Sequence, residues 1–311
     1  MKKILITGGA GFIGSALAEK LISDKENFVV IVDDLSTGEF AKLPNLPKTN
    51  WRFIKCDVNN YKDISSIMFG HHFDYVFHYA ALVGVQRTLL NPVSVLADLH
   101  GIENILSVSK NTGVKRVFFS SSSEVYGEPV EIPQNESTTP LNSRLPYAIV
   151  KNAGEAYLKS YYQEFGLEYT IFRFFNTYGP KQSKDFVVSR FISAALNNED
   201  ITIYGEGNQT RTFCYIDDNI DATLNAFYND MFVNDVANIG GADEITILEL
   251  ANTIIRATKS KSKIVFREAL KEGDMTRRLP DTSKMGILLN RKPLSLKEGL
   301  KNIVKNPQFI L

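Results

Sequence analysis

Short apolar runs alternate with longer helical stretches through the first half of the chain. The runs are nearly continuous in apolar residues, a pattern typical of parallel strands that are covered on both faces. A helix is predicted between the first two runs, since Ile13, Leu17 and Leu21 recur every four residues and share one face. Strands that alternate with helices favour an α/β fold with a doubly wound parallel sheet. The predicted strands are Lys3–Thr7, Phe28–Asp33, Trp51–Cys56, Tyr75–His78, Arg116–Ser120 and Tyr169–Phe174.

This alternation ends after about residue 176. The segment Asn176–Gln182 is rich in turn-forming residues, and Ile201–Gln209 contains two glycines. Further along, helices are predicted at Ile247–Thr258 and Ser295–Val304, with a charged loop around Lys271–Arg278 between them.

The change of pattern predicts two units. The larger is expected to comprise residues 1–175 and about 212–240, and the smaller, interleaved with it, about 176–211 and 241–311. We expect the smaller unit to close over the carboxyl edge of the parallel sheet, which is the edge where open α/β sheets bind ligands.

The charge balance and the cysteine count narrow the function classes. The 35 basic residues of the 311-residue chain equal its 35 acidic ones, so nothing supports a nucleic-acid or anionic-membrane partner, which would favour a basic excess. Cys56 and Cys214 are too few for a disulfide framework or a cysteine-rich metal site and favour buried thiols in a reducing compartment. The N-terminal segment Met1–Ile6 has a basic start, but its apolar run ends after a few residues and is too short for a signal peptide or a membrane span. We therefore expect a cytoplasmic globular protein without a bound metal.

A glycine-rich segment follows the first predicted strand and opens the first helix. Its glycines stand at positions 8, 11 and 14, a spacing that differs by one residue from the dehydrogenase fingerprint. Glycine lets the backbone approach a pyrophosphate closely, and the free N–H groups at the start of the helix then bind it. The alternative is a tight strand–helix turn without a ligand. Because strand, glycines and helix coincide, we favour a dinucleotide-binding Rossmann domain.

Acidic residues end the second and third predicted strands. Asp33 stands 19 residues after Gly14, where a carboxylate accepts hydrogen bonds from the adenosine ribose. Asp34 follows it, and the paired negative charge would repel a 2′-phosphate, so NAD is favoured over NADP. Asp57 and Val58 are candidates to face the adenine, although a surface turn fits their spacing equally well.

Two further patterns bring reactive side chains to the same edge of the sheet. Tyr147 and Lys151 stand four residues apart on a predicted helix, where the ammonium group favours the phenolate and lowers the pKa of the tyrosine. Such a tyrosine is a general base for an alcohol proton. The strand that ends near Ser120–Ser123 supplies hydroxyl groups, and Glu124 a second acid/base group. Taken singly, these patterns also fit a chance spacing among 13 tyrosines and a serine-rich turn.

Together and in this order, the three motifs resemble the extended short-chain dehydrogenase/reductases that modify nucleotide-sugars. The resemblance extends over essentially the whole chain. It also includes His78–Ala81, Arg173–Pro180, Ile203–Gly205, Gln209–Phe213 and Pro280–Asp281.

The resemblance implies an enzyme with a shared first step. Tyr147 would take the proton from the sugar 4-hydroxyl while hydride passes to the nicotinamide. Lys151 would hold the nicotinamide ribose, and Ser122 would bond the reacting oxygen, with Glu124 as a further catalytic candidate. NAD would be regenerated within the turnover. The residues implied for NAD are Gly8, Gly11, Phe12, Ile13, Gly14, Asp33, Asp34, Ser36, Asp57, Val58, Ala80, Ala81, Val83, Ser120, Tyr147, Lys151 and Phe174. Those implied for the nucleotide-sugar are Asn176, Val188, Tyr204, Arg211 and Arg278.

The outcome of the 4-keto intermediate divides the family into three activities. Deoxysugar 4,6-dehydratases usually carry an aspartate where this chain has Ser123. Glu124 is also found in UDP-glucuronate decarboxylases, and Arg278 stands where those enzymes carry an arginine that engages the sugar carboxylate. The helix start Pro146–Lys151 is more similar to that of the epimerases. C4 epimerisation of a UDP-hexose is therefore our first hypothesis, decarboxylation the next and 4,6-dehydration the third.

A protein of another class is the remote alternative. A regulatory protein that holds NAD without turnover would have this fold, because fold alone does not establish chemistry. The intact set of Ser122, Tyr147 and Lys151 argues against it, since a sensor does not need these residues.

The chain departs from the family pattern at two places. Asp98–Gly101 replaces the usual Asn-x-x-Gly, which puts the role of the asparagine in doubt and leaves His100 as a packed or surface residue. Lys271 and Glu272 replace an arginine that often precedes Gly-Asp. Diphosphate binding would then depend on Arg211 and Arg278.

The resemblance also implies a homodimer. Family members pair two helices into a four-helix bundle, and the matching helices here are Pro92–Thr112 and Tyr147–Phe165. Both carry apolar residues around much of their surface: Val93, Leu96, Leu99, Ile105, Leu106, Ala153, Ala156, Tyr157 and Tyr161. The alternative is that these helices simply cover the sheet.

Overall fold

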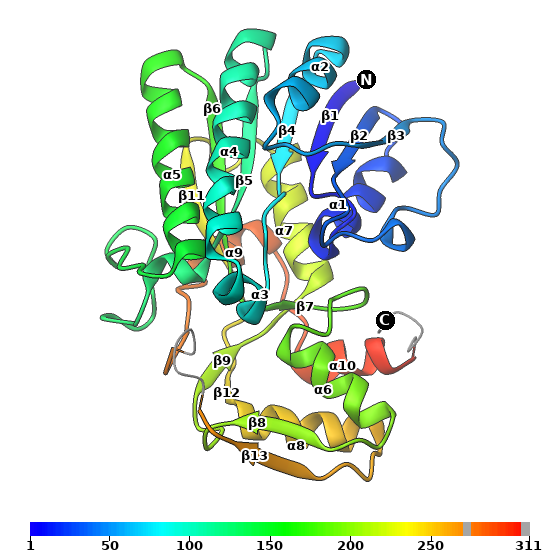
Figure 1. Ribbon diagram of the computed structural model, residues 1–311, viewed down its shortest axis with the longest axis vertical. Helices are drawn as coiled ribbons and strands as arrows, with labels where there is room; N and C mark the ends of the chain where they lie inside the picture. Colours follow the sequence, from blue (N-terminus) through cyan, green and yellow to red (C-terminus); the bar gives the residue numbers. More distant parts are fainter. Residues whose placement is uncertain (270–274, 306–311) are drawn as a thin grey trace.

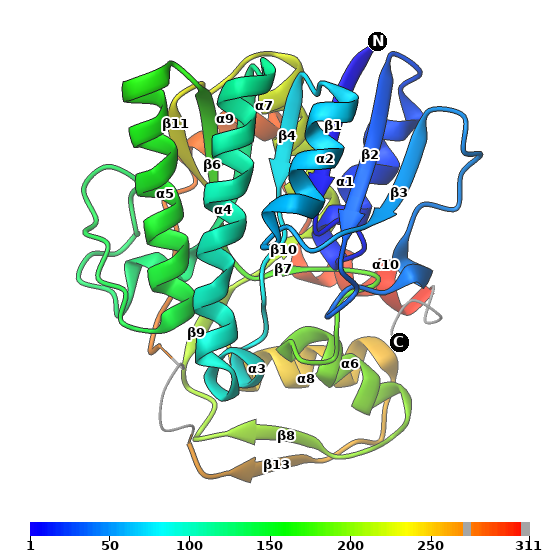
Figure 2. The same ribbon diagram turned by 45° about the horizontal axis from the view of Figure 1, so that its top comes forward.

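A seven-stranded parallel sheet is the framework of the larger unit. The computed structural model describes residues 1–269 and 275–305. Within them the strands run in the order β11-β6-β5-β4-β1-β2-β3 (Figures 1 and 2). Their bounds are β1 Lys2–Thr7, β2 Asn27–Asp33, β3 Trp51–Lys55, β4 Tyr75–His78, β5 Arg116–Ser122, β6 Glu168–Phe174 and β11 Asp235–Ile239. The order reverses between β1 and β4, which is the switch point where such sheets open a crevice.

The six strands predicted from the apolar runs are confirmed to within two residues at each end. The prediction did not identify β11, which comes after the alternation has ended and pairs with β6 at the edge of the sheet. It also ended β5 two residues early, because serines are not apolar. In the structure Ser120 pairs with Phe172 and Ser122 with Phe174, so two of the hydroxyl groups continue the strand.

Helices cover both faces of the sheet, as predicted. One face packs on α1 (Phe12–Ser23), α7 (Ile216–Tyr228) and α9 (Ser283–Leu289), and the other on α2 (Tyr61–His71), α4 (Pro92–Thr112) and α5 (Pro146–Phe165). Successive strand residues serve opposite faces: Ile4 and Ile6 join the first apolar core, and Leu5 joins the second. Figure 2 shows α2, α4 and α5 side by side. The doubly wound fold is thus confirmed.

The remaining elements form a second layer at the carboxyl edge of the sheet (Figure 1). The helix predicted at 247–258 is α8, which starts at a capping box formed by Thr246 and Glu249. The last predicted helix is α10, shifted by one residue. The division into two units at about residues 176, 212 and 241 stays a prediction. The elements of this layer are α3 Val85–Leu90, β7 Thr177–Tyr178, α6 Val187–Leu196, β8 Ile201–Tyr204, β9 Thr210–Thr212, β10 Cys214–Tyr215, β12 Glu244–Thr246, α8 Ile247–Thr258, β13 Ile264–Arg267 and α10 Leu296–Lys305.

Two smaller predictions concern the cysteines and the membrane. Cys56 and Cys214 are buried and free, as expected. Across residues 1–269 and 275–305, none of the helices has the length and apolar character that a bilayer span requires.

Candidate active site

A cavity of about 850 Å³ lies between the carboxyl edge of the sheet and the second layer. Every residue predicted to hold NAD lines it, from Gly8 to Phe174, and so do Ser122 and Glu124. Of the residues predicted for the nucleotide-sugar, Asn176, Val188 and Arg278 line it as well. The roles of these residues stay predictions, but the structure brings them to one cavity.

The glycine turn packs so closely against neighbouring backbone that side chains are excluded there. Gly8 has φ of +69°, and a Cβ on it would lie 2.7 Å from the Ala80 nitrogen. A Cβ on Gly14 would lie 2.4 Å from the Gly8 carbonyl oxygen. Helix α1 starts after Gly11, which has no side chain to cap the first N–H groups. These groups therefore remain available for a pyrophosphate.

Asp33 holds the turn and faces the cavity. Its carboxylate accepts hydrogen bonds from the backbone N–H groups of Ala10 at 3.0 Å and Leu35 at 2.9 Å. Burial raises the pKa of this carboxyl group, an effect that the two hydrogen bonds oppose. A Cβ on Gly38 would lie 2.5 Å from Asp33 Oδ1, so the following loop is also packed closely against it. The acidic end of β2 thus fits an adenosine ribose.

Tyr147, Lys151 and Ser122 converge from two elements. Helix α5 begins at Pro146, whose ring suits the first turn, and presents the tyrosine and the lysine on one face. Ser122, at the end of β5, acts on the Tyr147 phenol and lowers its pKa. Lys151 Nζ donates to Ser120 Oγ at 3.4 Å and lies 5.8 Å from the centroid of the Tyr147 ring.

The pKa of Tyr147 differs from expectation. Burial raises it well above its usual range and nearby Glu124 raises it further, while the bond to Ser122 and the charge of Arg278 act in the opposite direction. Burial lowers the pKa of Lys151 to about 8, and the carboxylate of Asp98 opposes this. The spacing of Tyr147 and Lys151 alone predicted the reverse for the tyrosine. The spacing of two residues in the chain does not reveal how deeply each side chain is buried, and burial is the main cause of both pKa shifts.

Glu124 is held by an arginine from the far end of the chain. Arg278 Nη2 lies 2.7 Å from Glu124 Oε1, and Nη1 donates to Ser123 Oγ at 3.5 Å. The arginine side chain is 7% exposed, and among the described residues its buried Nε has no hydrogen-bond partner. A guanidinium group that lines the cavity is suited to an anionic substrate.

Two predicted substrate residues lie away from the cavity lining. Tyr204 stacks beneath the guanidinium group of Arg190, with 5.7 Å to its ring centroid. Arg211 is buried on β9 and donates to the Thr210 carbonyl oxygen at 2.7 Å. Lys271 and Glu272, where the chain departs from the family, fall outside the described residues.

Asp98 is a site residue whose role the sequence did not identify. It lines the cavity from α4 and accepts a hydrogen bond from the backbone N–H of Leu82 at 2.7 Å. Its carboxylate also interacts electrostatically with Lys151. The departure from the family motif marked this position, but only the fold brings α4 beside α5. His100 is exposed, as the sequence analysis expected.

Arg87 was missed altogether. It lines the cavity from α3 and forms an ion pair of 2.6 Å with Asp185, which precedes α6. No pattern around it distinguishes it from a surface arginine. Over the part of the chain that the structure describes, no cluster of side chains is suited to a metal ion.

The fold, the glycine turn and the Ser122–Tyr147–Lys151 set together define a dinucleotide-binding protein of the short-chain dehydrogenase/reductase type. Comparison with known proteins agrees: residues 4–240 match the model of the NAD dependent epimerase/dehydratase family, and the chain belongs to that family. NAD is therefore the cofactor, as predicted.

The relatives carry out different reactions. The chain is 37% identical to a UDP-N-acetyl-alpha-D-glucosaminuronate decarboxylase of Bacillus cytotoxicus, over 98% of this chain and 97% of that protein. It is similar to the structure of a UDP-glucose 4-epimerase of Thermotoga maritima with UDP-glucose, at TM-score 0.91 and 33% identity over 98% of both chains. A Thermus thermophilus UDP-glucose 4-epimerase in complex with NAD matches at TM-score 0.90 and 27% identity, over 98% of this chain and 99% of the other.

Proposed function

We propose that this protein catalyses C4 epimerisation of a UDP-hexose through a 4-keto intermediate. The observation that carries the proposal is the state of the two acid/base candidates on the cavity wall. Ser122 lowers the pKa of the Tyr147 phenol, whereas the Glu124 carboxylate is already paired with Arg278. Epimerisation needs one group that removes and returns the 4-hydroxyl proton, and Tyr147 alone meets that need.

The chain's own residues fit NAD. The glycines at 8 and 14 stand where a Cβ would meet neighbouring backbone atoms, so the tight turn before α1 depends on them, and Asp33 stands at the end of β2 with its carboxylate fixed by two N–H groups. Asp34 accepts from the N–H and the hydroxyl of Ser36, so both carboxylates are ordered where a 2′-phosphate would lie. When bound, NAD supplies a hydride acceptor and, in the oxidised form, positive charge.

Tyr147, Ser122 and Lys151 each have a separate task. Tyr147 takes the proton of the sugar 4-hydroxyl and returns it, since its phenol lines the cavity beside Ser122. Ser122 orients the tyrosine and donates to the reacting oxygen. Lys151 holds the nicotinamide ribose and, while protonated, favours the phenolate.

Decarboxylation of UDP-glucuronate is the second candidate, and Arg278 favours it. This guanidinium group lines the cavity beside Glu124 and is largely buried. A sugar carboxylate would find there a cation, together with an acidic group for proton transfer.

Incubation of the purified protein with a panel of UDP-, GDP- and dTDP-sugars tests the proposal. An isomeric product of unchanged mass supports epimerisation, loss of carbon dioxide would assign decarboxylation, and loss of water would assign 4,6-dehydration. Tyr147→Phe is the control for a contaminating enzyme. Absence of both product and NAD reduction with every sugar would leave the regulatory alternative and would overturn the proposal.

We also propose that the protein is a homodimer joined through α4 and α5. These helices pack side by side, and Ile105 and Leu106 are buried against the sheet rather than available to a partner. Several other apolar side chains on the two helices remain exposed: Val93, Leu96, Ile149, Tyr162 and Phe165. Covering them with the same face of a second copy would give an isologous interface. Light scattering at micromolar concentration tests this, and a monomer mass would contradict it.

The reducing compartment is a proposal as well. Cys56 and Cys214 are both buried free thiols, which supports a location in the cytoplasm. Fractionation of the source cells would test it.

A further inference from the structure

A buried ion pair between Arg173 and Glu155 lies one helical turn along α5 from Lys151. Arg173 on β6 donates from Nε to Glu155 Oε1 at 2.9 Å and from Nη2 to Oε2 at 2.7 Å. The two side chains are 2% and 1% exposed. This bidentate arrangement fixes direction as well as distance.

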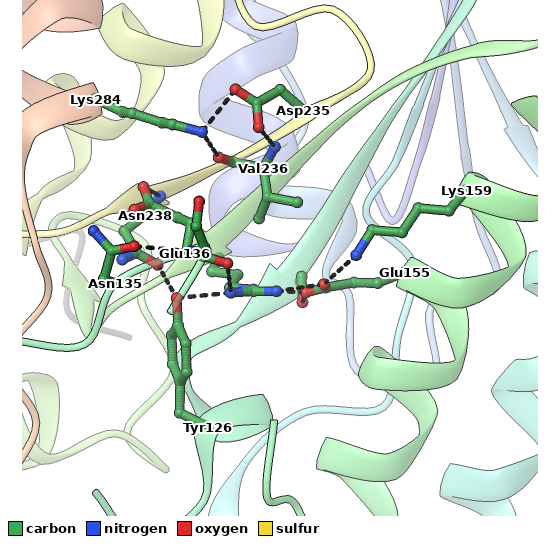
Figure 3. A network of polar contacts seen from close by, with 12 residues as sticks. Tyr126, Asn135, Glu136, Glu155, Lys159, Asp235, Val236, Asn238 and Lys284 are labelled. Carbon is green, nitrogen blue, oxygen red and sulfur yellow. Dashed lines mark hydrogen bonds and ion pairs between the residues drawn. The ribbon is translucent and has the colours of Figure 1, made fainter. Parts of the chain in front are cut away.

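The pair is joined to a wider set of hydrogen bonds, drawn in Figure 3. Arg173 Nη1 donates to the Tyr126 hydroxyl at 2.8 Å, and that hydroxyl donates to Asn238 Oδ1 at 2.8 Å. The backbone N–H of Asn238 donates to Glu136 Oε1 at 2.8 Å. The turn after β5, the loop at residue 136 and strand β11 are thereby held to the same arginine.

Glu155 belongs to the same helix as the catalytic tyrosine and lysine. Tyr147, Lys151 and Glu155 recur every four residues along α5. Ser121 Oγ donates to Glu155 Oε1 at 2.6 Å. Two consecutive serines of β5 therefore contact two successive turns of one helix, Ser120 with Lys151 and Ser121 with Glu155, and the next serine, Ser122, lowers the pKa of Tyr147 one turn earlier.

We propose that Glu155 and Arg173 are positioning residues that fix α5 along the end of β5, so that the Tyr147 hydroxyl meets Ser122. The proposal rests on the proposed function. Apolar packing of Val150 and Leu158 brings α5 onto the sheet, but such packing is non-directional and tolerates small sliding. A bidentate ion pair does not tolerate it.

Stability alone does not account for the pair. Burying two charges is costly, and replacing a buried ion pair with apolar residues of similar size is often neutral or stabilising. An apolar double replacement is thus expected to retain the fold while it removes the directional contact. That separation makes the proposal testable.

The test compares the double variant Glu155→Leu/Arg173→Met with Arg116→Met. Arg116, like Arg173, is a buried arginine in an ion pair, in this case with Asp230 at 2.7 Å. It stands at the start of β5, which is the end of that strand away from the cavity. We expect the double variant to bind NAD normally and to keep its KM, while kcat falls by about 10²-fold, since a displacement of about 1 Å has such an effect. Arg116→Met is expected to keep kcat.

One further measurement and one substitute variant make the test decisive. Hydrogen exchange at residues 147–151 is expected to accelerate in the double variant and not in Arg116→Met. If the double variant does not fold, Glu155→Gln takes its place with the same expectations. Normal kcat and normal exchange in a folded variant would overturn the positioning role. If the wild-type protein converts no nucleotide-sugar, the proposed function fails, and the exchange measurement still decides the positioning role.

Discussion

Arg278 and Glu124 stand 154 positions apart in the chain, yet they form an ion pair of 2.7 Å on the wall of the cavity. Their contact joins the C-terminal part of the chain to the turn after β5. It also determines which acid/base groups are free to act. With Glu124 engaged, Tyr147 is the group that we propose acts on a substrate hydroxyl, and an experiment on Glu124 distinguishes the activities of the family.

Glu124→Gln separates the possible reactions. In a C4 epimerase the change is expected to lower turnover only slightly, because Tyr147 carries the proton in both directions. In a decarboxylase or dehydratase that uses Glu124, turnover would fall by the ~10²–10⁴-fold typical of a lost general acid or base. The measurement is kcat with the preferred sugar. A large loss with an isomeric product would contradict our assignment of Glu124.

Tyr147→Phe removes the hydroxyl but keeps the ring, which packs in the apolar core beside Val150. We expect NAD and nucleotide-sugar still to bind, while turnover falls by ~10²–10⁴-fold. Calorimetric binding and product formation measure the two effects separately. Near-normal turnover would rule out the tyrosine as the base and, with it, the proposed mechanism.

Asp33→Ala is expected to weaken NAD binding and to relax the preference over NADP. Hydrogen bonds to a charged group contribute about 1.5–3 kcal/mol, so the loss should be roughly 10- to 100-fold in Kd. Asp33→Asn is the matched variant, because the amide oxygen still accepts from Ala10 or Leu35 while the charge is gone. Tighter binding of NADP than of NAD by the unmodified protein would contradict this prediction.

Asp98→Asn is expected to change the pH dependence. Burial sets the pKa of Lys151 to about 8, and the Asp98 carboxylate keeps it from falling further. Removing that negative charge lowers the lysine pKa, so the protonated form is lost at lower pH. The alkaline decline of kcat/KM should then move to lower pH by about 1 on the pH scale. The asparagine oxygen still accepts from Leu82, which preserves the fold.

Measurement of kcat/KM between about pH 6 and pH 10, for the wild-type protein and for Asp98→Asn, tests this prediction. Other titratable groups around the pair stay in place: Asp34 faces Asp98 from the end of β2, and Glu124 and Arg278 face Tyr147. Buried His78 faces Lys151 from β4, and because burial lowers its pKa to about 3 it stays neutral over this pH range. Identical profiles would show that Asp98 does not act on Lys151.

The local pattern of the chain was enough for the framework of the site. Apolar runs identified six strands, and the glycines at 8, 11 and 14 identified the turn after β1, because strand burial and backbone clearance depend on neighbouring residues. The resemblance then located Tyr147, Lys151 and Ser122, which the structure brings together at one cavity.

Other features were decided by the tertiary structure alone. Arg278 reaches Glu124, Asp98 acts on Lys151, and Arg173 holds Glu155, and each pair comes from elements that meet only when the sheet and its helices are packed. The high pKa of Tyr147 has the same origin, since desolvation depends on what surrounds a group in space. Hydrophobic periodicity is a property of neighbours in the chain. The charge around a side chain and its register against a neighbouring element depend on contacts between distant segments. The local pattern therefore predicted the strands and the glycine turn, whereas the packed fold was needed to define the charge environment of the site.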